Sequence, residues 1–144
     1  AEELVDKAIE HHGLENKPCS TRELSIHGNI ESSPNMNSHL YIYGSDLPQV
    51  LSLISEDQKY QEKIHPDYDY KVGEVVWSVR NEMARTVEDI LARRNRLLFL
   101  DAKAAIEAAP IVATTLGDEL KKDSDWVQQQ IEEFTNLAQN YVLS

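Results

Sequence analysis

The chain has 144 residues, a formal net charge of −11 at pH 7 and a single cysteine, Cys19. This length fits one domain that buries roughly 68–70% of the surface of its unfolded chain. The acidic balance argues against nucleic-acid binding, because neutralising phosphates requires a basic surface. The lone cysteine excludes an intrachain disulfide and favours a reducing compartment, so we expect a cytoplasmic location.

No apolar run approaches the roughly 18–20 residues that cross a bilayer, and no signal peptide is visible. The sequence begins at Ala1 rather than at a methionine, and its first residues already have a helix-forming pattern. We therefore expect residues 1–144 to form a single domain excised from a longer protein.

The first forty residues divide into a helix and an irregular segment. Apolar residues recur every three to four positions over 2–12, with acidic residues in the first turn and Gly13 as a stop signal. Residues 14–44 are rich in turn formers, so we expect little regular structure there. Two short stretches, 22–27 and 38–43, have strand-like composition and predict a small two-stranded pairing.

The next segment is predicted as a helix followed by a polar turn. Ser45 is the expected N-cap, Leu47, Val50, Leu51 and Ile54 follow a helical stripe, and the helix ends near Glu56. Residues 57–71 read as a solvated turn in which two tyrosines pack inward. The metal-capable side chains of 65–69 lack the glycine and terminal glutamate of a calcium loop and are too few for zinc.

Residues 72–84 predict a helix with one apolar face and a buried or interfacial tryptophan. The expected face consists of Val72, Val76, Val79 and Met83, and Trp77 is the tryptophan. The helix runs into a bend near residues 85–86.

An arginine-rich stretch follows and is the most unusual part of the sequence. Residues 80–96 hold five of the six arginines in an otherwise acidic chain: Arg80, Arg85, Arg93, Arg94 and Arg96. Thr86 reads as an N-cap, and Asp89 precedes Arg93 by four positions, the favourable order for an ion pair on a helix. The apolar run 97–100 is expected to be buried, and Asp101 to cap a second helix.

Three roles are open for this stretch. The favoured role is structural, in which Arg93, Arg94 and Arg96 pair with Glu88, Asp89 or Asp101. The others are contacts with a missing domain and direct binding of a phosphate or carboxylate, since a guanidinium fork suits all three. The structural or interdomain ion-pair candidates are Arg85, Asp89, Arg93, Arg94, Arg96 and Asp101.

Two long helices complete the chain. A stripe of alanines and aliphatic residues keeps its phase over 101–121, across Pro110, and predicts one kinked helix. Ser124 is the expected N-cap of a last helix that reaches about Val142 and packs antiparallel on the preceding one. We therefore predict an all-α domain, a bundle of about five or six helices with a short extended or irregular segment near residues 22–43.

The sequence contains no motif that carries chemistry. It lacks a glycine-rich phosphate loop, GxSxG, CxxC and HExxH, and no nucleophile is paired with a base. We therefore assign no catalytic, cofactor-binding or metal-binding residue within this fragment, and expect a helical accessory domain.

The run ARTVEDILARRNRLLFLDAKAA, residues 84–105, resembles the signature of one family, the C-terminal domain of FAD-dependent glycerol-3-phosphate dehydrogenases and the related α-glycerophosphate oxidases. The matching positions are Glu82, Ala84, Thr86, Asp89, Leu91, Arg93, Arg94, Arg96, Leu97, Phe99 and Leu100. Weaker matches are Pro18-Cys19-Ser20-Thr21 and Tyr43-Gly44-Ser45. Asn95 and the polar insert 29–38 depart from the pattern.

The resemblance implies a flavoprotein of glycerol metabolism that oxidises sn-glycerol 3-phosphate to dihydroxyacetone phosphate and passes electrons through FAD to quinone. It also implies that FAD and substrate bind the preceding N-terminal domain, against which this domain is a helical cap. That domain is the expected partner, a homodimer is left open, and membrane association is expected only through the full-length enzyme, at the inner face of the cytoplasmic membrane. The alternative is a free-standing interaction module whose arginine cluster docks an acidic partner.

Overall fold

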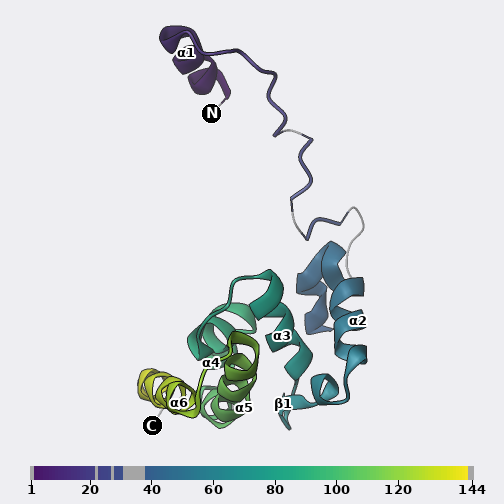
Figure 1. Cartoon of the computed structure of the whole chain (residues 1–144), viewed down its shortest axis with the longest axis vertical. Coiled ribbons are helices and arrows are strands. Elements are labelled where there is room, and N and C mark those ends of the chain that lie inside the picture. The colour runs from purple at the N-terminus through teal and green to yellow at the C-terminus, as the bar shows by residue number, and fades with distance from the viewer. Residues whose placement is uncertain (1, 22, 27, 31–37, 143–144) are drawn as a thin grey trace.

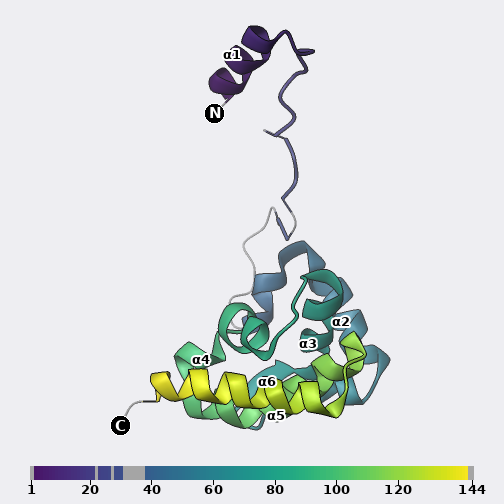
Figure 2. The same cartoon turned by 60° about the vertical axis from the view of Figure 1, so that its left-hand side comes forward.

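The computed structural model describes residues 2–21, 23–26, 28–30 and 38–142. Helices α2 to α6 pack together, whereas helix α1 (Glu2–His12) lies at the far end of an extended segment (Figures 1 and 2). The only strands among the described residues form one two-stranded hairpin. The prediction of an all-α fold with a small extended part is therefore confirmed.

The predicted helix over 2–12 is confirmed, but it buries none of its residues. The predicted strand pairing is wrong. Residues 23–26 belong to no strand, Arg22 and His27 lie outside the described residues, and 38–43 falls on the 3₁₀ helix η1 (His39–Asp46). Ser38 caps η1 by accepting the Leu40 N–H at 3.3 Å, so a local cap prevails over the β propensity of the tyrosine-rich run.

Helix α2 (Leu47–Glu56) ends where predicted, but it begins differently. Asp46 rather than Ser45 is the N-cap residue, and its side chain makes no capping bond. The buried face is centred on Val50 and Leu53, while Leu51 is 46% exposed, so the predicted stripe was rotated by part of a turn. This face joins a small core cluster that consists of Tyr43, Val50, Leu53, Val76 and Trp77.

The predicted turn over 57–71 is instead a short 3₁₀ helix, η2 (Lys59–Gln61), and an antiparallel hairpin of β1 (Lys63–His65) and β2 (Tyr68–Lys71). Tyr68 and Tyr70 do pack against the main core, as expected. His65 is only 6% exposed, and its Nε2 lies 3.1 Å from Glu107 Oε2 on helix α5. The hairpin is therefore held in place by contacts with distant parts of the chain.

Helix α3 (Val72–Asn81) is shorter than the predicted 72–84. Trp77 is buried, as expected, but Met83 is 79% exposed and adopts a left-handed backbone with φ 61°. A non-glycine residue in this conformation ends a helix and redirects the chain. Met83 is therefore a reversal point and not a core residue.

Four helical elements follow α3: a π-helix η3 (Asp89–Arg94), α4 (Leu97–Leu100), α5 (Ala102–Leu120) and α6 (Ser124–Ala138), with a last 3₁₀ turn η4 (Gln139–Tyr141). The single helix across Pro110 is confirmed. Leu97 and Leu98 are buried, but Phe99 and Leu100 are 55% and 66% exposed, so half of the predicted buried run is wrong.

Helix α6 runs back along α5, as predicted (Figure 2). Asp123, not Ser124, caps it by accepting the Trp126 N–H at 2.9 Å, and the α-helix stops at Ala138, short of Val142. Gly117 allows the two helices to approach closely, because a Cβ there would lie 2.7 Å from Val127 Cγ2. Small side chains along α5, most of them alanine, are buried in the main core.

Candidate functional site at the arginine-rich elbow

The arginine-rich elbow, residues 82–101, links the end of α3 to the start of α5. Its first half is fixed by a reciprocal cap. The Asp89 N–H donates to Thr86 Oγ1 at 3.1 Å, while Asp89 Oδ2 accepts the N–H groups of Thr86 and Arg85 at 3.0 and 2.9 Å. Burial opposes the charge on Asp89, but these hydrogen bonds outweigh it and lower the pKa of the carboxyl. The predicted Thr86 cap is confirmed.

Arg93 and Arg94 are adjacent but reach in different directions. Arg93 pairs with Asp89 and Glu88, each at 2.7 Å, within its own π-helical turn. Arg94 instead reaches back to Glu82, with Nε 2.9 Å from Oε2, and also donates to the Glu82 carbonyl at 2.6 Å. The first set of contacts is local, and the second ties the elbow to the end of α3.

Arg85 and Arg80 also have partners inside the domain. Arg85 Nη1 donates to the carbonyls of Val79 and Ala84 at 3.1 and 2.7 Å, which satisfies acceptors left free where α3 ends. Arg80 forms a bidentate pair with Glu119 on α5, at 2.7 and 2.8 Å. The hydrogen bond from Glu119 raises the pKa of Arg80 above its usual range.

Arg96 differs from the other elbow arginines. It has a left-handed backbone with φ 60°, and its guanidinium lies 5.9 Å from the centroid of the Phe99 ring. Within the described part of the chain, no carboxylate pairs with it. The exposed Phe99 ring in turn meets the Tyr141 ring edge to face at 5.6 Å, so a cation and two aromatic rings form one exposed surface.

Asp101 is the N-cap residue of α5 and pairs with no arginine in the described structure. Its Oδ1 accepts the Ala104 N–H at 3.0 Å, and Tyr68 O–H donates to Oδ2 at 3.3 Å. The Ala104 hydrogen bond is the main reason that the pKa of Asp101 is lowered. The predicted cap is confirmed, and the elbow thus brings together Asp89 with Arg93 but not Asp101 with Arg96.

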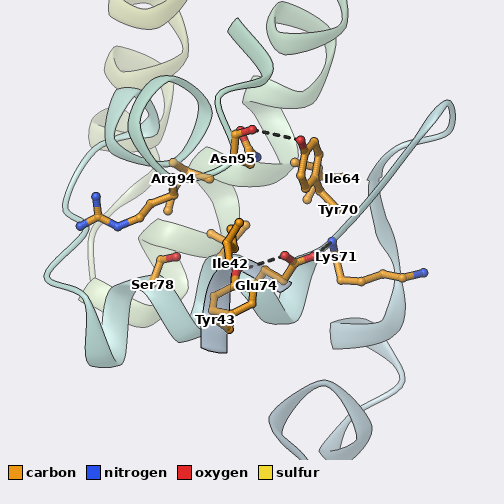
Figure 3. A pocket seen from close by; sticks show the side chains of 11 residues that line it. Ile42, Tyr43, Ile64, Tyr70, Lys71, Glu74, Ser78, Arg94 and Asn95 are labelled. Atoms are coloured by element: carbon orange, nitrogen blue, oxygen red, sulfur yellow. Dashed lines mark hydrogen bonds between the residues drawn. The ribbon is translucent and has the colours of Figure 1, made fainter. Parts of the chain in front are cut away.

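A small pocket adjoins the elbow, between Arg94 and Asn95 on one side and Tyr43 and Glu74 on the other (Figure 3). Glu74 is only 7% exposed and accepts the Lys71 N–H at 2.8 Å and the Tyr43 O–H at 3.1 Å. His39 Nε2 lies 3.0 Å from the same carboxylate. Burial, followed by the charge of Glu74, raises the pKa of Tyr43 well above its usual range, so its hydroxyl stays protonated and donates.

The side chains of Glu74 and Arg94 at this pocket therefore already have partners within the domain. Tyr70 O–H, which also lines the pocket, donates to the Asn95 carbonyl at 3.0 Å, so the hairpin is joined to the elbow as well. No group of three or more metal-ligating side chains occurs among the described residues. The arrangement holds elements together and offers no activated nucleophile.

Sequence reasoning missed three parts of this region: Glu82 as the partner of Arg94, the Arg80–Glu119 pair, and the buried Glu74. Each of these contacts joins residues that are far apart in sequence, and no local spacing signals them. The partial exception is Glu74, which follows the N-cap residue Lys71 by three positions and accepts its N–H.

The chain matches the family model of the C-terminal domain of alpha-glycerophosphate oxidase over residues 19–127. The chain belongs to this family. The resemblance expected from the elbow sequence is thereby confirmed, and the match includes the whole of the elbow.

Several curated relatives of this chain are named as glycerol-3-phosphate dehydrogenases. The mitochondrial enzyme of Saccharomyces cerevisiae is 28% identical over 98% of this chain and 28% of its own length. The probable mitochondrial enzyme of Caenorhabditis elegans is 34% identical over 92% of the chain and 21% of its own length, and the human mitochondrial enzyme is 28% identical over the same shares.

The chain therefore spans only about a fifth to somewhat over a quarter of the length of these relatives, and it corresponds to their C-terminal part. No solved structure matches the chain. Across the described residues, no helix combines the length and apolar character that a bilayer crossing requires.

Proposed function

We propose that the full-length protein that contains this chain is an FAD-dependent glycerol-3-phosphate dehydrogenase. It oxidises sn-glycerol 3-phosphate to dihydroxyacetone phosphate. The observation that carries the proposal is the family match over residues 19–127, together with relatives that bear the name of this enzyme. The chain itself is the C-terminal accessory domain and contributes no catalytic residue.

FAD would take up the hydride from carbon 2 of the substrate and pass the two electrons on to quinone. The residues described here do not fit FAD. The pocket beside the elbow is small, its carboxylate is occupied by Tyr43, Lys71 and His39, and no helix N-terminus opens onto it from a glycine-rich turn. The flavin and substrate sites therefore belong to the rest of the full-length protein.

The partner of this domain is that catalytic body. The surface formed by Arg96, Phe99, Leu100 and Tyr141 faces it, because these side chains are exposed and the Arg96 cation lies beside an aromatic ring and pairs with no carboxylate of the described residues. Apolar and aromatic side chains with one arginine are the composition of an interface centre. Whether a second copy of the protein is a further partner, in a homodimer, is left open.

The alternative, a free-standing module that docks an acidic partner through its arginines, needs several free guanidinium groups. Arg80, Arg93 and Arg94 already pair with carboxylates of the same domain. We also propose that the full-length enzyme contacts a mitochondrial membrane rather than the cytoplasmic membrane expected from sequence. The reason is that the yeast and human relatives are named as mitochondrial enzymes.

The test is an assay of the purified full-length protein. We expect bound flavin in its absorbance spectrum and reduction of a soluble quinone analogue that depends on sn-glycerol 3-phosphate. A protein that retains no flavin, or that oxidises only unrelated substrates, would overturn the proposal. Quinone specificity is read from the same assay with ubiquinone and menaquinone analogues.

A further inference from the structure

Helix α1 has an apolar face that no other helix of the described structure covers, although Val5 and Ile9 share a shallow hollow with Lys17, Cys19 and Thr21 of the segment that follows. Leu4, Val5 and Ile9 lie on one side of it, and the charged residues Glu3 and Lys7 pair on the other side at 2.8 Å. Leu4 is 77% exposed and Val5 54% exposed, and no residue of α1 is buried. A helix of 11 residues is marginal by itself in water, because its stability comes from packing that face.

The segment after α1 is also exposed until it meets the domain at one point. Leu24 and Ile26 are 66% and 78% exposed, and the chain runs extended away from α1 (Figures 1 and 2). Contact begins at Gly28, whose carbonyl accepts the Ser45 N–H at 3.3 Å. Gly44 lies directly against this carbonyl, where a Cβ would overlap it, and Gly44 has a φ of 51°.

The comparisons also separate α1 from the domain. The model of the C-terminal domain begins at residue 19, beyond the end of α1. The yeast relative nevertheless matches 98% of the chain, so α1 has a counterpart in that protein. It is thus a part of these enzymes that lies outside the C-terminal domain.

We propose that α1 is the closing helix of the catalytic body that precedes this domain, and that the body covers the face formed by Leu4, Val5 and Ile9. The connection between the two domains is then the segment 13–28, and the single-domain description of 1–144 is replaced by one helix of the body, a linker and the cap. The inference rests on the proposed function only in requiring that a preceding body exists. The chain covers 28% of the yeast relative, which leaves ample length for such a body.

Hydrogen–deuterium exchange of the α1 amides tests the inference, measured in the 144-residue chain and in the full-length protein. We expect exchange close to the unprotected rate in the chain alone and at least about 100-fold slower in the full-length protein. Protection of α1 in the chain alone would mean that it packs on its own domain. Absence of protection in both proteins would mean that no body covers it. Either result overturns the inference.

Variants identify the face. Leu4→Gln with Val5→Gln in the full-length protein is expected to remove most of the α1 protection, and Glu10→Gln, on the opposite side, to leave it unchanged. Equal effects would overturn the assignment of the face. The quinone assay is read separately: protected α1 without glycerol-3-phosphate oxidation rejects the proposed function alone, and oxidation with unprotected α1 rejects this inference alone.

Discussion

At the scale of residues, the elbow arginines differ in what surrounds them. Arg94 makes one ion pair and one backbone hydrogen bond to Glu82 with a side chain that is 35% exposed. Arg93 is 52% exposed, and Arg96 lies beside the Phe99 ring and has no carboxylate partner in the described part of the chain. Because screening by water weakens exposed pairs, identical substitutions at these positions should have unequal effects.

Arg94→Met should lower the free energy of unfolding by about 1–3 kcal/mol, because it leaves the Glu82 carboxylate and carbonyl without their donor. Arg93→Met should cost about 1 kcal/mol or less. Urea denaturation of the 144-residue chain measures both. Arg96→Met is the matched control, with an expected change within about 0.5 kcal/mol, and a loss there as large as that of Arg94→Met would contradict the assigned contacts.

Stability should fall in acid through Asp89. Its folded pKa is lowered below the unfolded value of about 3.9, so its contribution is fully present above that value and is lost as the pH falls through the folded pKa. The urea concentration at the unfolding midpoint should therefore decrease once the pH is lowered below about 4. In Asp89→Asn the difference between pH 6 and pH 3 should be smaller, and an undiminished difference would assign the acid sensitivity to other carboxylates.

At the scale of elements, sequence reasoning succeeded where the pattern is long and local. The helices over 2–12 and 102–120 were predicted because their apolar stripes or cap signals extend over several turns. The hairpin of β1 and β2 was missed, because its stability depends on tyrosines that pack against distant helices. The end of α3 was missed because the left-handed Met83 carries no glycine signal.

The same division holds for the elbow. The Thr86 cap and the Asp89–Arg93 contact follow from spacings of three and four residues. The Arg94–Glu82 pair requires the reversal at Met83, and the exposure of Phe99 and Leu100 requires the position of α4 against its neighbours. Neither feature is encoded in a local spacing.

Helix α5 contains a proline whose removal should be stabilising. Pro110 is exposed and cannot donate a backbone hydrogen bond to the preceding turn. Pro110→Ala should therefore raise the free energy of unfolding, by up to about 3 kcal/mol. Thermal and urea unfolding of the chain measure the gain. A loss of stability would instead mean that the proline sets a bend that the packing against α3 and α6 requires.

At the scale of the whole molecule, the chain is an acidic helical domain, and the described residues leave two apolar or aromatic surfaces uncovered. One is the surface of Arg96, Phe99, Leu100 and Tyr141, and the other is the apolar face of α1. The two uncovered surfaces and the share of the relatives' length that the chain occupies lead to the same conclusion. They support our proposal that the chemistry lies in a preceding body that these 144 residues contact.

Calorimetric titration of the 144-residue chain with FAD, and separately with sn-glycerol 3-phosphate, tests this conclusion most directly. The full-length protein titrated with sn-glycerol 3-phosphate provides the positive control. We predict no binding of either compound to the isolated chain at micromolar concentrations. Micromolar binding of either one would place a cofactor or substrate site inside the cap and contradict the assignment of all such chemistry to the rest of the protein.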